Sequence, residues 1–99
     1  MRKIEMNMNS AVMLGRDWSG ANTSTKKIYG ADAKVGVYLH GNHIATVWGA
    51  CHGRDKWTVE VNTRTLADYP TRTTMSRLRA LGVDVCTRKG EVLLSGVAL

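Results

Sequence analysis

A chain of 99 residues is long enough for one hydrophobic core and too short for two, so we expect a single domain over residues 1–99. Hydrophobic residues make up 43% of the chain and charged residues 22%, which excludes a disordered polymer. Fourteen Lys and Arg residues stand against eight Asp and Glu residues, giving a net charge of +6. Such a surplus favours polyanions or acidic protein surfaces as partners.

The sequence also bears on the compartment of the protein. No apolar run predicts a membrane span, and the segment MRKIEMNMNS at the start lacks the apolar centre of a secretory signal. Cys51 and Cys86 are too few for the disulfide framework of a small secreted protein. We therefore expect a cytoplasmic protein with no membrane partner, in which both cysteines are free thiols.

The first third of the chain combines an alternating stretch with a polar one. In KIEMNM, the apolar Ile4, Met6 and Met8 alternate with polar residues, which predicts a half-buried strand over residues 3–8. The next segment, LGRDWSGANTSTKK, is rich in Gly, Asn, Ser and Thr. That composition predicts a loop, with Trp18 packed onto the domain.

The middle of the chain predicts consecutive antiparallel strands. Two β-rich runs, residues 35–39 and 43–48, are separated by HGN, in which Gly41 and Asn42 tolerate the positive φ of a tight hairpin turn. The run KWTVEV, residues 56–61, alternates as a third strand would.

Residues 71–82, TRTTMSRLRALG, carry signals for both ends of a helix. Thr71, Thr73 or Thr74 can accept the first free amide protons, and Gly82 follows the last apolar residue. The segments VDVCT and EVLLSG then flank RKG, which predicts a second hairpin with a basic tip. The sequence thus predicts an α+β fold, in which a small antiparallel sheet, a three-stranded meander plus a C-terminal hairpin, packs against one helix.

Basic residues concentrate around this helix. Residues 71–90 hold five cations against the single acid Asp84, which leaves +4 of the net +6. Wound as a helix, the segment places small side chains opposite its apolar stripe, at Thr73, Ser76 and Ala80. A small face between flanking arginines lets another backbone approach closely. Arginines on such a helix also cover apolar rims with their stems, so the pattern fits a purely structural role as well.

Metal and catalytic sites have weak support. His40 and His43 straddle a hairpin turn, whereas Cys51 and His52 lie beyond the next strand, so the four do not converge as zinc ligands. Ser19 lies in no Gly-x-Ser-x-Gly turn, the acids show no telling pair, and no phosphate loop is present. We expect no catalytic residue, no metal and no cofactor, and therefore a protein that is not an enzyme.

Three aromatic residues lie on the predicted strands. Trp48, Trp57 and Tyr38 would stack unpaired bases if they faced solvent on an open sheet. The chain has no Phe, however, so large aromatic side chains are also its bulkiest core fillers. We expect at least two of the three in the core.

Three segments carry a resemblance: GRDWSGANTS, VYLHGNHIATV and TRTTMSRLRAL. Together they resemble a group of small proteins encoded by tailed bacteriophages and prophages. Those proteins carry Trp-Ser-Gly-x-Asn-Thr, Leu-His-Gly-Asn-x-Ile-Ala and Thr-Thr-x-Ser-Arg-Leu-x-Ala-Leu in the same order. The resemblance covers most of residues 15–81, brings no activity with it, and implies a phage protein made inside a bacterial host.

Two functions follow as hypotheses. The first is nucleic-acid binding through the basic helix and C-terminal hairpin, with phosphate contacts from Arg72, Arg77, Arg79, Arg88 and Lys89. The second is inhibition or modulation of a host polymerase, nuclease or defence factor through an acidic surface. Both use the same positive side chains, so charge alone does not separate them.

Overall fold

Tight turns of two residues connect most neighbouring strands of the structure. We describe residues 2–28, 34–49 and 56–98 of a computed structural model. Four pairs of turn residues have positive φ at both positions: Ala21–Asn22, His40–Gly41, Lys89–Gly90 and Ser95–Gly96. Such pairs match the right-handed twist of the flanking strands, so each turn returns the chain as a hairpin.

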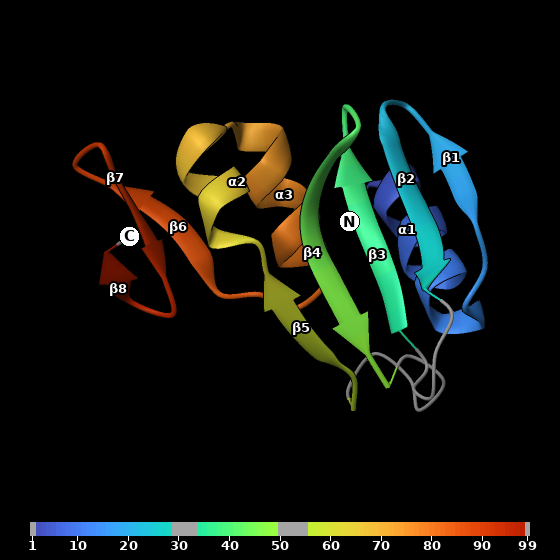
Figure 1. The fold of residues 1–99 in the computed structure, drawn as a ribbon. Helices are drawn as coiled ribbons and strands as arrows, with labels where there is room; N and C mark the ends of the chain where they lie inside the picture. Colours follow the sequence, from blue (N-terminus) through green and yellow to red (C-terminus); the bar gives the residue numbers. More distant parts are fainter. Residues whose placement is uncertain (1, 29–33, 50–55, 99) are drawn as a thin grey trace.

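The strands form two antiparallel sheets. The larger sheet has five strands in chain order, namely β1 (Trp18–Gly20), β2 (Thr23–Ile28), β3 (Lys34–Leu39), β4 (Asn42–Trp48) and β5 (Thr58–Val61). The C-terminal sheet has three strands, β6 (Val85–Arg88), β7 (Glu91–Leu94) and β8 (Val97–Ala98). Figure 1 shows that the second sheet stands beside the β5 edge of the first.

Three helices cover one face of the five-stranded sheet (Figure 1). They are α1 (Lys3–Leu14), α2 (Thr63–Asp68) and α3 (Arg72–Ala80). The core lies between the two layers, where Met8 and Val12 of α1 and Leu78 of α3 meet inward-facing valines of β3 and β4. No described helix covers the opposite face, which carries every second side chain of the inner strands.

The α+β class, the central hairpin and the third strand are confirmed. The helix predicted over residues 71–82 is confirmed as α3. The Thr71 hydroxyl accepts the Thr74 amide proton at 3.1 Å, and Gly82 follows the helix with a φ of 101°. Cys86 is a free thiol, as expected, and Cys51 lies outside the described residues.

The secondary structure predicted for the first third of the chain is wrong, although Trp18 packs against the core as expected. Residues 3–8 are the first half of helix α1, because Met8, Ala11 and Val12 recur at helical spacing on its buried face while Met6 is exposed. The predicted loop contains strands β1 and β2. Thr23 and Thr25 of β2 face the core, so polar composition concealed an alternating strand.

The helix content is also larger than the sequence indicated. The 12-residue α1 is the longest described helix, and α2 fills the segment before Pro70. The meander gains β1 and β2 at its start, and the C-terminal hairpin gains β8.

The packing of α3 can be tested at Leu78, which is fully buried. Replacing it with alanine should lower the free energy of unfolding by about 2–4 kcal/mol, because the cavity left behind loses its contacts. Leu14→Ala is the matched control, since Leu14 is 67% exposed and its truncation should change little. Chemical denaturation measures both, and equal stability of the two variants would contradict this packing.

Candidate nucleic-acid interface

Arg77 is buried between two helices and a strand. Its Nη1 donates to Oε2 of Glu5 at 2.9 Å, and its Nε donates to the Thr23 hydroxyl at 3.0 Å. The residue is only 4% exposed. Its predicted role in a contact surface is therefore wrong, because α1, which was predicted to be a strand, covers this flank of α3.

The small-residue face of α3 is covered as well. The Ser76 hydroxyl donates to the Glu5 carboxylate, and the Ala80 carbonyl accepts a hydrogen bond of 2.9 Å from Asn9 Nδ2. Small side chains do let another backbone come close at this face, as expected. The neighbour is helix α1 of the same chain.

Glu5 is the acid at the centre of this contact. Burial alone would raise its pKa, but hydrogen bonds from Ser76, Arg77 and the Arg2 amide outweigh burial and hold the pKa below its ordinary value of 4.5. The carboxylate also lies in the first turn of α1, where the helix dipole favours negative charge. Glu5 and Arg77 therefore form a satisfied pair of buried ions.

The four other predicted cations are exposed, Arg72 and Arg79 on α3 and Arg88 and Lys89 at the tip of the β6–β7 hairpin. Strand β6 runs antiparallel to α3. Its Val85 carbonyl accepts from Arg79 Nε at 2.8 Å, and its Thr87 hydroxyl contacts the Met75 sulfur at 3.2 Å. We call these four residues the basic side.

The order of contacts along α3 and β6 places the four cations. Arg79 lies at the end of the pair where β6 begins. Arg72 precedes Met75 by one turn, and Arg88 and Lys89 follow Thr87, so these three lie toward the other end. The cations are thus distributed along a continuous structural unit.

The sheet face without helices is a second exposed surface, which we call the open face. Strand register places one row of side chains there from Ser24, Tyr38 and His43, and another from Lys34 and Trp48. Lys26, Thr46 and Glu60 lie between these rows, beside Gly36.

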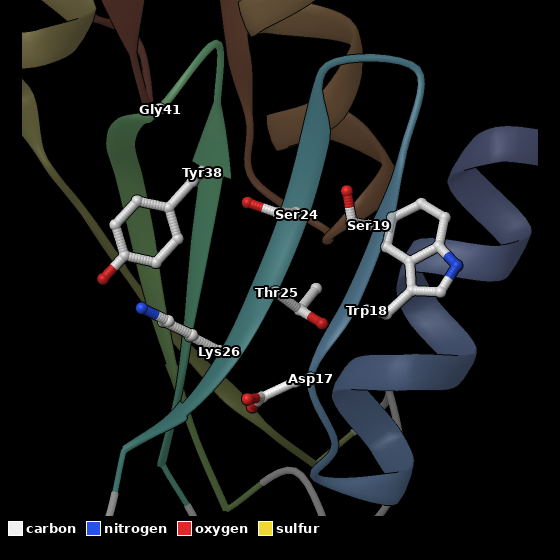
Figure 2. Close-up of a pocket in the computed structure, with 8 residues that line it drawn as sticks. All are labelled: Asp17, Trp18, Ser19, Ser24, Thr25, Lys26, Tyr38 and Gly41. Carbon is white, nitrogen blue, oxygen red and sulfur yellow. The ribbon is translucent and has the colours of Figure 1, made fainter.

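Tyr38 lies flat on the open face. A Cβ atom built at Gly36 would lie only 3.0 Å from Tyr38 Cε1 and 3.1 Å from its hydroxyl oxygen, so the ring rests on the bare backbone of Gly36. Figure 2 shows the ring broadside, with Lys26 beside it and Ser24 on the neighbouring strand. These three residues line an open groove of about 600 Å³, together with Asp17, Trp18, Ser19, Thr25 and Gly41.

His43 is fixed beside Tyr38. The two ring centroids are 5.2 Å apart and the rings are tilted by 48°. Asn62 Nδ2 lies 3.3 Å from His43 Nδ1, and the Thr46 hydroxyl lies 2.8 Å from Nε2. Because the amide nitrogen donates to Nδ1, the proton of a neutral imidazole sits on Nε2 and points at Thr46.

The expectation that at least two of the three aromatic residues lie in the core is wrong, because only Trp57 does. Trp57 is buried and donates from Nε1 to the Leu81 carbonyl at 2.9 Å. Tyr38 and Trp48 lie instead on the open face, where the ammonium of Lys34 stands 4.1 Å from the centre of the Trp48 ring. Counting the alternation from Val35 and Val37 would have found this face, since it puts residues 34, 36 and 38 together.

The four zinc candidates form no cluster among the residues that the structure describes. His40 occupies the hairpin turn and His43 belongs to the open face, whereas Cys51 and His52 lie outside the described residues. Among the described residues, no group of three potential metal ligands occurs.

The fold and its two exposed surfaces define a small, basic α+β protein. The family model of the Kyanoviridae Gp96 protein matches residues 1–96, so the chain belongs to this family of phage proteins. The phage origin implied by the three sequence segments is thereby confirmed. No curated protein and no solved structure matches the chain. Within the described ranges, no helix has the length and apolarity needed to cross a membrane.

The buried ion pair gives a first prediction for this region. Arg77→Ala should lower the free energy of unfolding by about 3–5 kcal/mol, because Glu5 is left as a buried charge without its cation. Arg79→Ala is the matched control, since Arg79 is exposed and its loss should cost far less. Denaturant titration compares the two variants, and equal midpoints would contradict the buried position of Arg77.

The lowered pKa of Glu5 gives a second prediction. Because the pKa is lower in the folded state, the ionised carboxylate stabilises the fold above its ordinary value of 4.5, and this contribution is lost as the pH falls through the folded pKa. The stability difference between the wild type and Glu5→Gln should therefore be largest near neutral pH and shrink in acid. Unfolding curves measured from neutral to acidic pH test this, and a difference independent of pH would refute it.

Proposed function

We propose that the protein binds nucleic acid, with phosphate contacts from the basic side: Arg72, Arg79, Arg88 and Lys89. The observation that carries the proposal is the exposure of these four cations along α3 and the β6–β7 hairpin. The buried Glu5–Arg77 pair is internally neutral, so the remaining residues carry the whole net charge of +6. Phosphate is a ligand that guanidinium groups bind well, through paired N–H donors.

Two acidic residues lie close to the cations of the basic side. Glu91 faces Arg88 across the β6–β7 hairpin, and Asp84 precedes β6. These acids reduce the positive field but leave the guanidiniums of Arg72 and Arg79 on the surface of α3. We therefore expect binding through several weak phosphate contacts, which steer association and carry little sequence information.

Salt dependence tests this function. The affinity for a mixed-sequence DNA or RNA should fall steeply with salt, because each phosphate contact releases counterions. Arg72→Ala and Arg79→Ala should each flatten the plot of log affinity against log salt by about one unit, on all sequences alike. Fluorescence anisotropy at several salt concentrations measures the slope. Absence of binding to both DNA and RNA at low salt would overturn the proposal.

A protein target is the second candidate, favoured by a groove at the sheet edge. Strand β5 ends the five-stranded sheet, and a groove of about 530 Å³ runs beside it, lined by Trp57, Val59, Val61, Leu81, Gly82, Val83, Asp84, Leu94 and Ser95. An extended segment of a host polymerase, nuclease or defence factor can add to such an edge through backbone hydrogen bonds. A pull-down from host lysate, with and without nuclease, separates the two functions. A partner retained after nuclease that slows amide exchange at Val59 and Val61 would favour this candidate.

A further inference from the structure

We infer that the open face binds unpaired bases of a single-stranded nucleic acid, with Tyr38 and Trp48 as two stacking platforms. The inference rests on the proposed function, because it names the class of nucleic acid. It uses residues on a different surface from the basic side, so the two can fail separately.

Tyr38 has the geometry of a platform. Its ring lies against the Gly36 backbone, so one aromatic face is covered by the strand and the other faces the groove (Figure 2). Any side chain at position 36 would lift the ring, since even a Cβ atom would approach it to 3.0 Å. A base stacks on a flat, outward-facing ring whatever its identity, because every base has a π-face.

The surroundings of Tyr38 suit a nucleotide. The Ser24 hydroxyl and the Lys26 ammonium line the same groove and offer hydrogen-bond donors to a base edge or a phosphate. His43 supports the ring from the next strand and is held on both of its nitrogens. The platform is therefore ordered before a ligand arrives, which lowers the entropy cost of binding.

Trp48 is the second platform, and Lys34 is its movable cover. The Lys34 ammonium stands 4.1 Å from the ring centre, in a half-exposed cation–π contact. Such a contact is weaker than base stacking, so an arriving base can displace the ammonium. The flexible lysine stem then lets the cation pair with the phosphate of the same nucleotide.

The spacing of the platforms favours a nucleic acid over a folded protein partner. Lys34, which pairs with Trp48 across the sheet, and Tyr38 are four residues apart on β3, or about 13 Å along the strand. Between them lie Gly36 and Thr46, so the apolar surface is divided into two separate rings. A protein interface needs a contiguous apolar centre, whereas successive bases need separate platforms.

The charges of the open face also favour a single strand over a duplex. Lys26 and Lys34 are balanced by Glu60 and Asp17, and Asp17 accepts the Lys27 amide proton at 2.8 Å. A face with so little net charge does not hold a duplex by its phosphates. Stacking should therefore supply the affinity here, with a weak dependence on salt.

The experiment is an anisotropy titration of labelled oligothymidylate, oligouridylate and a duplex of matched length. Tyr38→Leu and Trp48→Leu should each weaken single-strand binding about tenfold, the size of one base–aromatic stack, and leave the salt slope unchanged. Tyr38→Phe should restore binding, because it keeps the ring. Tyr69→Leu is the matched control, since Tyr69 is 53% exposed but follows α2, away from the open face. Binding of the single strands should also quench the tryptophan fluorescence of the wild type, and the part of this quenching that comes from Trp48 should be absent in Trp48→Leu.

Three outcomes would overturn the inference. If the open-face variants bind single strands as the wild type does while Arg72→Ala weakens binding, the open face is not used and the proposed function survives. If the duplex binds as tightly as the single strands, the class of nucleic acid is wrong. If neither DNA nor RNA binds at low salt, the proposed function fails and takes this inference with it. Circular dichroism shows whether each variant is folded.

Discussion

The ion pair between Glu5 and Arg77 fixes the arrangement on which both exposed surfaces depend. It joins residues 72 positions apart and ties α1 to α3, while Arg77 also donates to Thr23 of β2. The two buried ions must stay in contact, because burying either ion without its partner costs far more folding free energy than burying the pair. Helix α1 is therefore bound to the helical layer by a specific polar contact in addition to apolar packing.

The position of α1 decides what the rest of the molecule can present. Because α1 covers the flank of α3 that holds Ser76 and Arg77, only the flank next to β6 stays exposed, and it carries Arg72 and Arg79. All three helices lie on one side of the sheet, which leaves the aromatic side chains of the opposite face uncovered. The four cations of the basic side and the two rings of the open face thus lie on two different surfaces. Under the proposed function, charge would govern attraction and the rings would govern the kind of ligand that stays.

Local signals predicted the parts of the fold that local interactions determine. The central hairpin and the capped helix α3 follow from residues within a few positions of one another, although the positive-φ pair of the turn is His40–Gly41 and not Gly41–Asn42 as expected. Helix α1 could not be read in this way, because Ile4 and Met8 fit both an alternating and a helical spacing and only the tertiary partner decides. The same applies to Arg77, whose acid lies in the segment that was mistaken for a strand. Of the five predicted cations, four are exposed, and the open face was missed because at least two of the three aromatic side chains were expected in the core.

A β-bulge between β3 and β4 completes the open face. Between β3 and β4 the register shifts at Val37 and Tyr38, so that Tyr38 pairs with His43 although Val37 pairs with Ala45. Ile44 is the extra residue, and it points into the core beside Ala45. In a regular ladder Ile44 would stand opposite Tyr38 on the open face, and His43 would be turned toward the helices. The bulge therefore buries an apolar side chain that would otherwise be exposed and brings a polar ring beside Tyr38. Since the glycine at position 36 lets Tyr38 lie flat, the bulge and the glycine together build the platform from backbone geometry.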